Sequence, residues 1–268
     1  MQKIVIAGAA GRTGSIIVKC AAKTRDVKVT GAIESASHPK IGTDAGEIAD
    51  IGKLGIALSS DLKTALSNAD VLIDFTFHTV VANNVQIASA LKKPVIIGTT
   101  GLDDAETKAV KDASKVIPIV WAPNMSLGVN LLFAMVRKSA EALGMGYSIE
   151  IDETHHIHKK DAPSGTALKL GEKAAEGIKK DFKQTMIHDP EGTGNIHDQS
   201  KIVIRSYRKG EVIGDHTVSF ENEGERIELT HHAESREAFA MGAVRAAQWI
   251  TGKKPGLYDM QDVLGLKS

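Results

Sequence analysis

Residues 3–15, KIVIAGAAGRTGS, decide the fold of this chain. The first five form a short, continuously apolar segment, which is typical of a strand buried on both faces of a parallel sheet. Three glycines follow at positions 8, 11 and 14, in a G-x-x-G-x-x-G spacing that is a variant of the dinucleotide-binding turn. Such glycines permit a tight bend and let the backbone approach a pyrophosphate at the N-terminus of the helix predicted over residues 15–22.

A carboxylate follows at the position where a nucleotide ribose would bind. The next predicted strand, residues 27–33, ends at Glu34, twenty residues after Gly14. In dinucleotide-binding units an acid at about this distance accepts hydrogen bonds from the adenosine ribose hydroxyls. Taken alone, Glu34 could equally be a solvated charge at a strand end. The order of strand, glycine turn, helix, strand and acid favours nucleotide binding.

Strands and helices alternate through the rest of this half. Apolar strands are predicted at 71–75, 94–98 and 117–121, and helices at 61–68, 79–91 and 104–114. Residues 35–60 contain four glycines and are predicted to be loop with short pieces of regular structure. The alternation predicts an α/β domain with a Rossmann-type, doubly wound parallel sheet.

Ligands of such sheets bind beyond the carboxyl ends of the strands. We therefore expect one crevice, the cofactor site, to be lined by the residues at these strand ends. They are Gly8, Ala9, Ala10, Gly11, Arg12, Thr13, Glu34, Phe75, Gly98, Thr99, Thr100, Ala122, Pro123 and Asn124.

The pattern changes near residue 126. A helix is predicted at 127–143, a strand at 147–151, a second helix from Ser164, and a loop over 181–199. Three long strands of alternating polar and apolar residues follow, at 201–208, 212–221 and 226–232, with a hairpin at 222–225. This alternation predicts an α+β domain with a mostly antiparallel sheet.

The closing helix, predicted at 235–251, is expected to return to the first half of the chain. The expected division is a dinucleotide-binding domain of residues 1–126 with 235–268, and a substrate-binding domain of residues 127–234. The two crossings would form a hinge. Substrate pockets prefer such boundaries, so we expect the substrate in the cleft between the domains.

The stretch 153–167, ETHHIHKKDAPSGTA, concentrates the chemistry of the second half. Three histidines and two lysines lie within residues 155–160. Pro163 cannot continue a helix, and Ser164 is a good N-cap for the one that follows. The first N–H groups of a helix bind a carboxylate or phosphate. Proton donors and ammonium groups beside such an anion site suit a small, doubly charged acid that needs a proton.

This stretch has two other interpretations. The H-H-x-H cluster could bind a transition metal, with Asp152 or Glu153 as a further ligand. No Cys or Glu-x-x-His partner at metal spacing accompanies it, so no metal is expected. A basic loop is also often only solvated. The ordered helix start directly behind the loop favours a functional site.

Composition limits the function classes. Lys+Arg and Asp+Glu both total 33, which favours neither nucleic acid nor an anionic membrane as partner. The longest nearly apolar run, Leu127–Val136, is half a membrane span, and no export signal precedes Lys3. The single cysteine, Cys20, fits a reducing compartment. We expect a soluble, cytoplasmic protein.

Several longer motifs occur together in this order. They are GAAGRTG at 8–14, GTTG at 98–101, APNMS at 122–126, ETHHIHKKDAPSGTA at 153–167, SREAFAMGAVRAA at 235–247 and GLYDMQDVL at 256–264. With these motifs and Glu34, essentially the whole chain resembles the 4-hydroxy-tetrahydrodipicolinate reductase family, formerly called dihydrodipicolinate reductase, of lysine and diaminopimelate biosynthesis. The resemblance implies hydride transfer from NADH or NADPH to the unsaturated ring of a small dicarboxylate, after loss of a hydroxyl as water.

The resemblance also implies roles for individual residues. His155 would be the proton donor and Lys159 a second, cationic participant, while His156, Gly165 and Thr166 would hold a substrate carboxylate. A histidine of near-neutral pKa is suited to neutralising the negative charge that hydride addition leaves. Met125 and Arg236 would join the cofactor site, although Arg236 could instead lie at the hinge. The family is a homotetramer assembled through the second domain's sheet, so the polar faces of the strands at 201–232 are the expected interface.

Two positions depart from the family pattern. Phe77 and His78 stand where some members carry an arginine, which leaves an anion contact there open. Ser35 follows Glu34, where members that use NADPH well often carry a basic residue. Glu34 favours a free ribose hydroxyl, and Arg12 or Lys40 could still bind a 2′-phosphate. We expect dual specificity, with NADH used at least as well as NADPH.

Two rival functions lead to different expectations. An aspartate-semialdehyde dehydrogenase needs a thiolate nucleophile, and the only candidate, Cys20, falls in the first helix as a core residue. That interpretation is rejected. A non-catalytic NAD(P)-sensing protein would need the dinucleotide fold but not the histidine–lysine stretch.

Overall fold

The computed structural model describes residues 1–189 and 199–267. The chain divides into two compact units, Met1–Leu127 with Arg236–Ser268, and Gly128–Ser235. The sequence predicted divisions after residues 126 and 234. Each lies one residue before the division seen in the structure. Within the described ranges, no helix combines the length and the apolar content that a membrane crossing needs.

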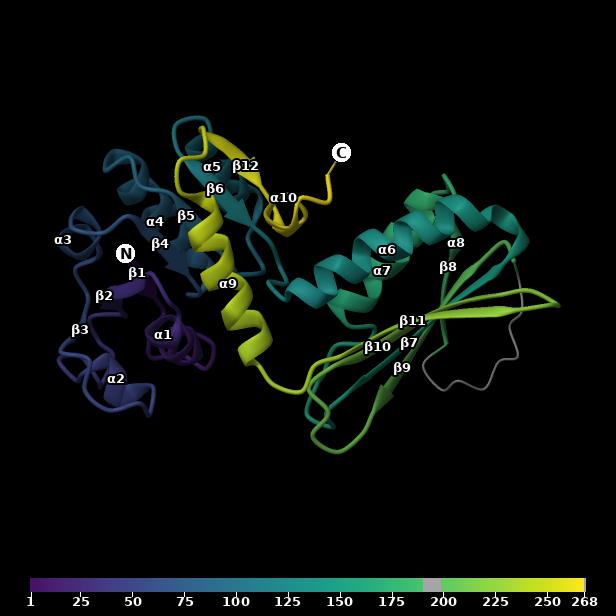
Figure 1. Cartoon of the computed structure of the whole chain (residues 1–268), viewed down its shortest axis with the longest axis horizontal. Helices are drawn as coiled ribbons and strands as arrows, with labels where there is room; N and C mark the ends of the chain where they lie inside the picture. The colour runs from purple at the N-terminus through teal and green to yellow at the C-terminus, as the bar shows by residue number, and fades with distance from the viewer. Residues whose placement is uncertain (190–198, 268) are drawn as a thin grey trace. The chain divides into compact units, whose positions relative to one another are not determined.

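The first unit contains a seven-stranded sheet in which all pairings are parallel (Figure 1). The spatial order is β12-β6-β5-β4-β1-β2-β3. The strands are β1 (Gln2–Ala7), β2 (Val27–Ile33), β3 (Leu58–Ser59), β4 (Val71–Asp74), β5 (Val95–Ile97), β6 (Pro118–Trp121) and β12 (Gly256–Tyr258). This confirms the predicted Rossmann-type sheet. The order reverses between β1 and β4, and at such a switch point the strand ends leave a crevice for a ligand.

Helices cover both faces of this sheet. On one face the apolar side chains of α1 (Gly14–Lys23), α9 (Glu237–Ile250) and α10 (Met260–Leu264) form a core with the strands. On the other face α3 (Leu62–Ser67), α4 (His78–Ala90) and α5 (Asp104–Ser114) do the same. The short α2 (Ala45–Ile48) lies in the glycine-studded segment. Because both faces are covered, every residue from Ile4 to Ala7 is fully buried.

The end of the chain is more regular than the sequence predicted. Residues after 251, for which the sequence predicted no helix or strand, form β12 and α10. β12 pairs with β6 and forms the edge of the sheet, and Asp259 caps α10 through a capping box. A three-residue strand and a five-residue helix are too short to give a periodic signal, so this packing could not be foreseen from pattern alone.

The second unit has a five-stranded sheet in the order β11-β10-β7-β9-β8 (Figure 1). Its elements are α6 (Leu127–Leu143), the 3-10 turn η1 (Gly144–Gly146), β7 (Ser148–His155), α7 (Gly165–Gly177), α8 (Phe182–Thr185), β8 (Met186–Asp189), β9 (Ile202–Arg208), β10 (Asp215–Glu221) and β11 (Arg226–His232). β10 pairs antiparallel with β7 and β11, whereas β9 pairs parallel with β7 and β8.

The sheet is therefore mixed rather than mostly antiparallel. Alternation of polar and apolar residues looks the same in both kinds of pairing, so it could not separate them. Helix α7 carries the chain back to the end of the sheet at which β7 began, and a strand entered from such a crossover runs parallel to β7. The hairpin predicted at 222–225 is confirmed, with Glu221 paired to Arg226.

Two local differences affect the site. β7 does not end at residue 151 but continues to His155. The predicted loop over 181–199 contains α8 and β8, and residues 190–198 of that segment lie outside the described residues. Helices α6 and α7 pack on one face of the sheet, where Val136, Leu170 and Phe220 are fully buried in a common core. The opposite face carries Glu150, Asp152 and Arg205, with Val203 among them.

Candidate active site

The glycine turn of the first unit fits only glycine at two positions. Gly8 has φ +78°, and a Cβ there would lie 2.3 Å from the carbonyl oxygen of Phe75. A Cβ on Gly14 would lie 1.9 Å from the carbonyl oxygen of Gly8. The turn closes through a 3.0 Å bond from the Gly11 N–H to the Gly8 carbonyl. The backbone is thus bare at the N-terminus of α1, as a bound pyrophosphate requires.

Two cavities open at the carboxyl ends of the strands. The larger, of about 650 Å³, is lined by Gly8, Gly11, Glu34 and Phe75 among the predicted cofactor residues, and also by Ser35 and Lys63. The smaller, of about 250 Å³, is lined by Thr13, Phe75, Gly98, Pro123, Asn124, Met125 and Phe239. Phe75 lines both cavities. The larger cavity contains the Glu34 carboxylate, and the smaller one is lined by the rings of Phe75 and Phe239. These linings suit the ribose end and the nicotinamide end of a dinucleotide.

The remaining predicted cofactor residues do not line these cavities. Ala9, Thr99 and Ala122 are buried. Ala10, Arg12 and Thr100 follow the same strand ends with side chains outside the two linings. Arg236 is exposed at the N-cap of α9.

A buried carboxylate that the sequence analysis did not select holds two of these strand ends together. Asp74, fully buried, accepts hydrogen bonds from the Thr76 hydroxyl at 2.6 Å, the Thr99 hydroxyl at 3.0 Å and the Asn84 amide at 2.8 Å. Thr99 is therefore occupied in fixing the end of β5 against the end of β4. An acid closing the apolar run VLID was the signal for this role.

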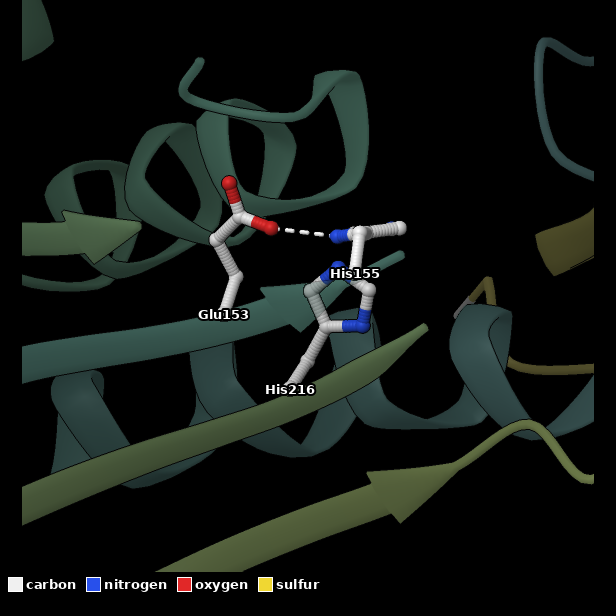
Figure 2. Close-up of side chains that lie close together, drawn as sticks. All are labelled: Glu153, His155 and His216. Atoms are coloured by element: carbon white, nitrogen blue, oxygen red, sulfur yellow. Dashed lines mark hydrogen bonds and ion pairs between the residues drawn. The ribbon is translucent and has the colours of Figure 1, made fainter. Parts of the chain in front are cut away.

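In the second unit, Glu153, His155 and His216 lie close together near the ends of β7 and β10 (Figure 2). His155 Nδ1 and Glu153 Oε2 are hydrogen-bonded. Glu153 is fully buried, and burial opposes its ionisation. The hydrogen bonds from His155 and Ser206 and the charge of Arg208 outweigh burial and lower the pKa of Glu153 to about 2. An ionised carboxylate therefore faces the imidazole.

His216 is the second imidazole of this cluster. Its ring stands edge-on to His155, with 5.1 Å between centroids and 79° between planes. Burial, and after it the charge of His155, lowers the pKa of His216 to about 3. His216 is thus neutral near pH 7, and its Nε2 lies 3.2 Å from the Ser164 hydroxyl.

Ser164 connects this cluster to the start of α7. Its hydroxyl accepts the Ala167 N–H at 3.1 Å, which confirms the predicted N-cap. Its own N–H donates to Glu153 Oε1 at 3.1 Å. The intrahelical ladder begins with Leu168 N–H to the Ser164 carbonyl, so the amides of Gly165 and Thr166 precede it. A Cβ on Gly165 would meet nothing within 4 Å.

The loop between β7 and α7 carries the predicted lysine. Lys159 Nζ lies 2.7 Å from Asp161 Oδ2, and this contact is the main cause that lowers the pKa of Asp161. Arg208 holds the loop from the end of β9. It donates to the backbone carbonyls of Lys159 at 3.3 Å and Asp161 at 2.5 Å, and to Glu153 Oε1 at 3.2 Å. The Ala162–Pro163 peptide bond is cis.

Glu153, His155 and His216 also bring three potential metal-ligand atoms within 4.8 Å of one another. This set shares only His155 with the H-H-x-H histidines of the sequence. The Glu153 and His155 atoms already bond to each other, and the Arg208 guanidinium lies beside the same carboxylate. A neighbouring positive charge disfavours a cation, so the cluster suits proton transfer better than metal binding.

Cys20 lies on α1 and is buried. Burial, followed by the charge of Glu237, raises the pKa of its thiol. A thiol held in its neutral form is a poor nucleophile, which supports the rejection of the semialdehyde dehydrogenase hypothesis.

Comparison with known families accounts for both units. A model described as "Dihydrodipicolinate reductase, N-terminus" matches residues 2–125, and one described as "Dihydrodipicolinate reductase, C-terminus" matches residues 128–264. The chain belongs to the dihydrodipicolinate reductase family. A curated relative from Anaeromyxobacter dehalogenans, named 4-hydroxy-tetrahydrodipicolinate reductase, is 47% identical over 267 residues, covering 100% of this chain and 99% of that protein.

Solved structures agree with this family's fold. A dipicolinate-bound dihydrodipicolinate reductase from Paenisporosarcina sp. TG-14 has a TM-score of 0.77 at 20% identity, covering 98% of each chain. GenD2 from gentamicin A biosynthesis, solved in complex with NAD, has a TM-score of 0.62 at 11% identity and covers 99% of this chain and 90% of its own. The first unit of this dihydrodipicolinate reductase family member is a nucleotide-binding Rossmann fold.

Within this family member, sequence reasoning missed Arg208 and His216 and considered Glu153 only as a metal ligand. Arg208 is the last residue of β9 and His216 is the second residue of β10, and both strands were predicted. Their place next to the histidine stretch depends on strand pairing. Arg208 pairs with His155 across β7 and β9, and His216 pairs with Glu153 across β7 and β10.

Proposed function

We propose that this protein reduces 4-hydroxy-tetrahydrodipicolinate to tetrahydrodipicolinate with NADH or NADPH, in lysine and diaminopimelate biosynthesis. The observation that carries the proposal is the buried Glu153–His155 pair beside the N-terminus of α7 in a chain of this family. A dehydrating reduction of this kind releases one water and adds one hydride and one proton. The cytoplasm, where Cys20 would stay reduced, is the proposed location.

The first unit fits the proposed cofactor. The bare backbone at Gly8 and Gly14 suits a pyrophosphate, and Glu34 in the 650 Å³ cavity suits ribose hydroxyls. Phe75, Gly98, Pro123, Asn124 and Met125 would then border the nicotinamide end. Backbone groups at Ala9, Ala10, Arg12, Thr13, Thr99, Thr100 and Ala122, with the Arg236 side chain, are proposed to complete the site. The bound reduced nicotinamide would supply the hydride.

The second unit would supply the proton and bind the substrate. His155 is the proposed proton donor, since histidine is the commonest general acid of enzymes and its Nδ1 is held by the carboxylate of Glu153. The α7 N-terminus, at Gly165 and Thr166, would bind one substrate carboxylate through helix-end amides and the helix dipole. His156 would assist, because within the described ranges its Nδ1 is buried and makes no hydrogen bond. Lys159, already beside Asp161, would stabilise developing negative charge.

We further propose a homotetramer assembled through the polar face of the second unit's sheet. Charged side chains on that face form ion pairs with one another. Arg205 lies 2.7 Å from Glu150 on the neighbouring strand, and Arg226 lies 2.8 Å from Glu228. Tyr207 on the same face is 40% exposed. Light scattering after gel filtration would give a mass near four times 28.5 kDa if the proposal is right, and near 28.5 kDa if it is wrong.

The proposed activity is tested by nicotinamide absorbance. Purified protein is mixed with NADH and freshly made cyclic substrate, for the wild type and for His155→Ala. Wild-type protein should consume NADH, and the variant should be on the order of a hundredfold or more slower, because it lacks the general acid. NADH binding, followed by fluorescence titration, should be unchanged, since His155 belongs to the other unit.

Two outcomes would contradict the assignment. If His155→Ala kept more than about half of wild-type turnover, His155 would not be the general acid. A flat wild-type trace with intact NADH binding would favour the NAD(P)-sensing protein instead.

A further inference from the structure

We infer that Glu153 is the positioning residue of this site: it fixes His155 as the tautomer with hydrogen on Nδ1, so that Nε2 exchanges the proton, and it ties His155 to the start of α7. The inference deepens the proposed function and rests on it for the role of His155. It adds a residue that acts through the imidazole rather than on the substrate.

The two carboxylate oxygens of Glu153 have different hydrogen-bond partners. Oε2 bonds to His155 Nδ1, as Figure 2 shows. Oε1 accepts the Ser164 N–H at 3.1 Å and both terminal nitrogens of Arg208 at 3.2 Å. An ionised carboxylate only accepts hydrogen bonds, so the ring nitrogen that faces it must carry hydrogen.

The imidazole of His155 has little freedom to turn. His155 is 8% exposed, and His216 stands edge-on against its ring. The remaining nitrogen, Nε2, lies on the side of Gly214, where a Cβ would come within 3.1 Å of it. A glycine at this position therefore leaves Nε2 uncrowded. Nδ1 is committed to Glu153, so Nε2 is the atom left for proton exchange.

Replacing Glu153 by glutamine should change the tautomer of His155. The amide has one acceptor and one donor end. Two partners, Ser164 and Arg208, donate towards the Oε1 position, so the amide oxygen would settle there. Its NH₂ would then face His155 Nδ1, which must become an acceptor. The neutral ring would switch to the tautomer with hydrogen on Nε2.

The same substitution should affect kcat and the substrate KM differently. Loss of the Nδ1–H tautomer should lower kcat on the order of a hundredfold, because Nε2 then holds its hydrogen in the neutral ring. The start of α7 keeps its acceptor for the Ser164 N–H, so the substrate KM should change by less than about threefold. A purely structural role would disturb both constants.

A matched control exists in the first unit. Glu106 is also buried, and its carboxylate contacts His78 Nδ1 at 2.9 Å. Glu106→Gln places the same chemical change against a histidine outside the proposed site. It should alter the His78 signals and leave both the His155 tautomer and turnover as in the wild type.

The experiment is a long-range ¹H–¹⁵N spectrum of the neutral histidine rings, together with steady-state kinetics. The proteins compared are the wild type, Glu153→Gln and Glu106→Gln, with His155→Asn for assignment. We expect Nδ1–H for His155 in the wild type and Nε2–H in Glu153→Gln. Nε2–H in the wild type, or an unchanged tautomer in Glu153→Gln, overturns the inference.

Two further outcomes remain decisive. If Glu153→Gln does not fold, Glu153→Asp keeps the charge. That variant should keep the Nδ1–H tautomer, with a smaller loss of kcat than His155→Asn causes; a switched tautomer in it overturns the inference. If the wild type does not consume NADH at all, the proposed function fails, while the wild-type spectrum still decides which nitrogen of His155 carries the hydrogen.

Discussion

His155 and Arg208 stand directly opposite each other in the parallel pairing of β7 and β9. Both side chains bond to Glu153, one to each carboxylate oxygen. Arg208 also donates to the backbone carbonyls of Lys159 and Asp161. One guanidinium therefore joins the strand end that carries the proposed acid to the loop that carries the proposed cation.

This arrangement makes Arg208→Lys a non-conservative change. Lysine keeps the charge but loses the planar fork that reaches four acceptors at once, including the Tyr207 carbonyl. Losing hydrogen bonds to a charged group costs about 1.5–3 kcal/mol each, so the substrate KM should rise at least roughly tenfold while the cofactor KM stays unchanged. Steady-state kinetics test this, with Arg137→Lys on α6 as the control. Equal effects of the two variants would show that Arg208 does not order the loop.

Gly165 offers a test of the carboxylate site. A side chain there meets no protein atom within 4 Å, so Gly165→Val should fold and interfere only with a ligand. We expect the substrate KM to rise on the order of tenfold or more, because a branched side chain would cover the amides at the start of α7. Gly146→Val, also in open space, is the control. A cofactor KM that rises as much as the substrate KM would mean that the position is structural.

The choice of nicotinamide cofactor depends on the cavity that contains Glu34. Glu34 and Ser35 line it, and so does Lys63, whereas Arg12 and Lys40 do not. We expect NADH to be used at least as well as NADPH, because Glu34 repels a 2′-phosphate. Ser35→Arg should shift the ratio of catalytic efficiencies towards NADPH. Lys63→Gln should shift it away, since Lys63 is the ammonium group in that cavity.

Kinetics with each cofactor at saturating substrate decide this prediction. Lys53→Gln, a change on an exposed lysine paired with Glu47, should leave the ratio unchanged. A wild-type preference for NADPH of about tenfold or more, equal to about 1.4 kcal/mol, would contradict the expectation.

Because of His216, the free energy of unfolding should decrease in acid. Its folded pKa of about 3, against an ordinary 6.5, results first from burial and then from His155. Below pH 6.5 the unfolded chain takes up a proton that the folded chain refuses. The stabilising contribution is therefore complete above pH 6.5 and declines as the pH falls from 6.5 towards 3. Each pH unit inside this window costs about 1.4 kcal/mol.

Urea unfolding at pH 7 and at pH 4.5 measures this effect. Between the two conditions His216→Asn should lose about 2 kcal/mol less stability than the wild type. The charged and titratable neighbours of this position, His155, Glu153, His231 and Asp215, are the same residues in both proteins. His38→Asn, in the other unit, is the control. A loss in His216→Asn equal to that of the wild type would contradict the pKa assignment.

The sequence predicted the features that depend on neighbouring residues. The glycine turn after β1, the acid at Glu34 and the N-cap at Ser164 are local patterns with a direct steric or hydrogen-bonding cause. The alternating strands predicted a second sheet but not its direction, because the polar–apolar period is the same in parallel and antiparallel pairs.

Long-range partners could not be predicted in this way. Arg208 follows His155 by 53 residues, and His216 follows Glu153 by 63, yet strand pairing places each pair side by side. The register of β7 with β9 and β10 is set by the whole packed unit. Asp74 shows the same limit, since its partner Thr99 lies at the end of a different strand.

The central claim is that the protein transfers a hydride to its cyclic substrate. The most direct measurement uses NADH carrying deuterium at both C4 positions, with mass spectrometry of the product. The account predicts tetrahydrodipicolinate that contains one deuterium. Unlabelled product, or no product from protein that binds NADH, would contradict it.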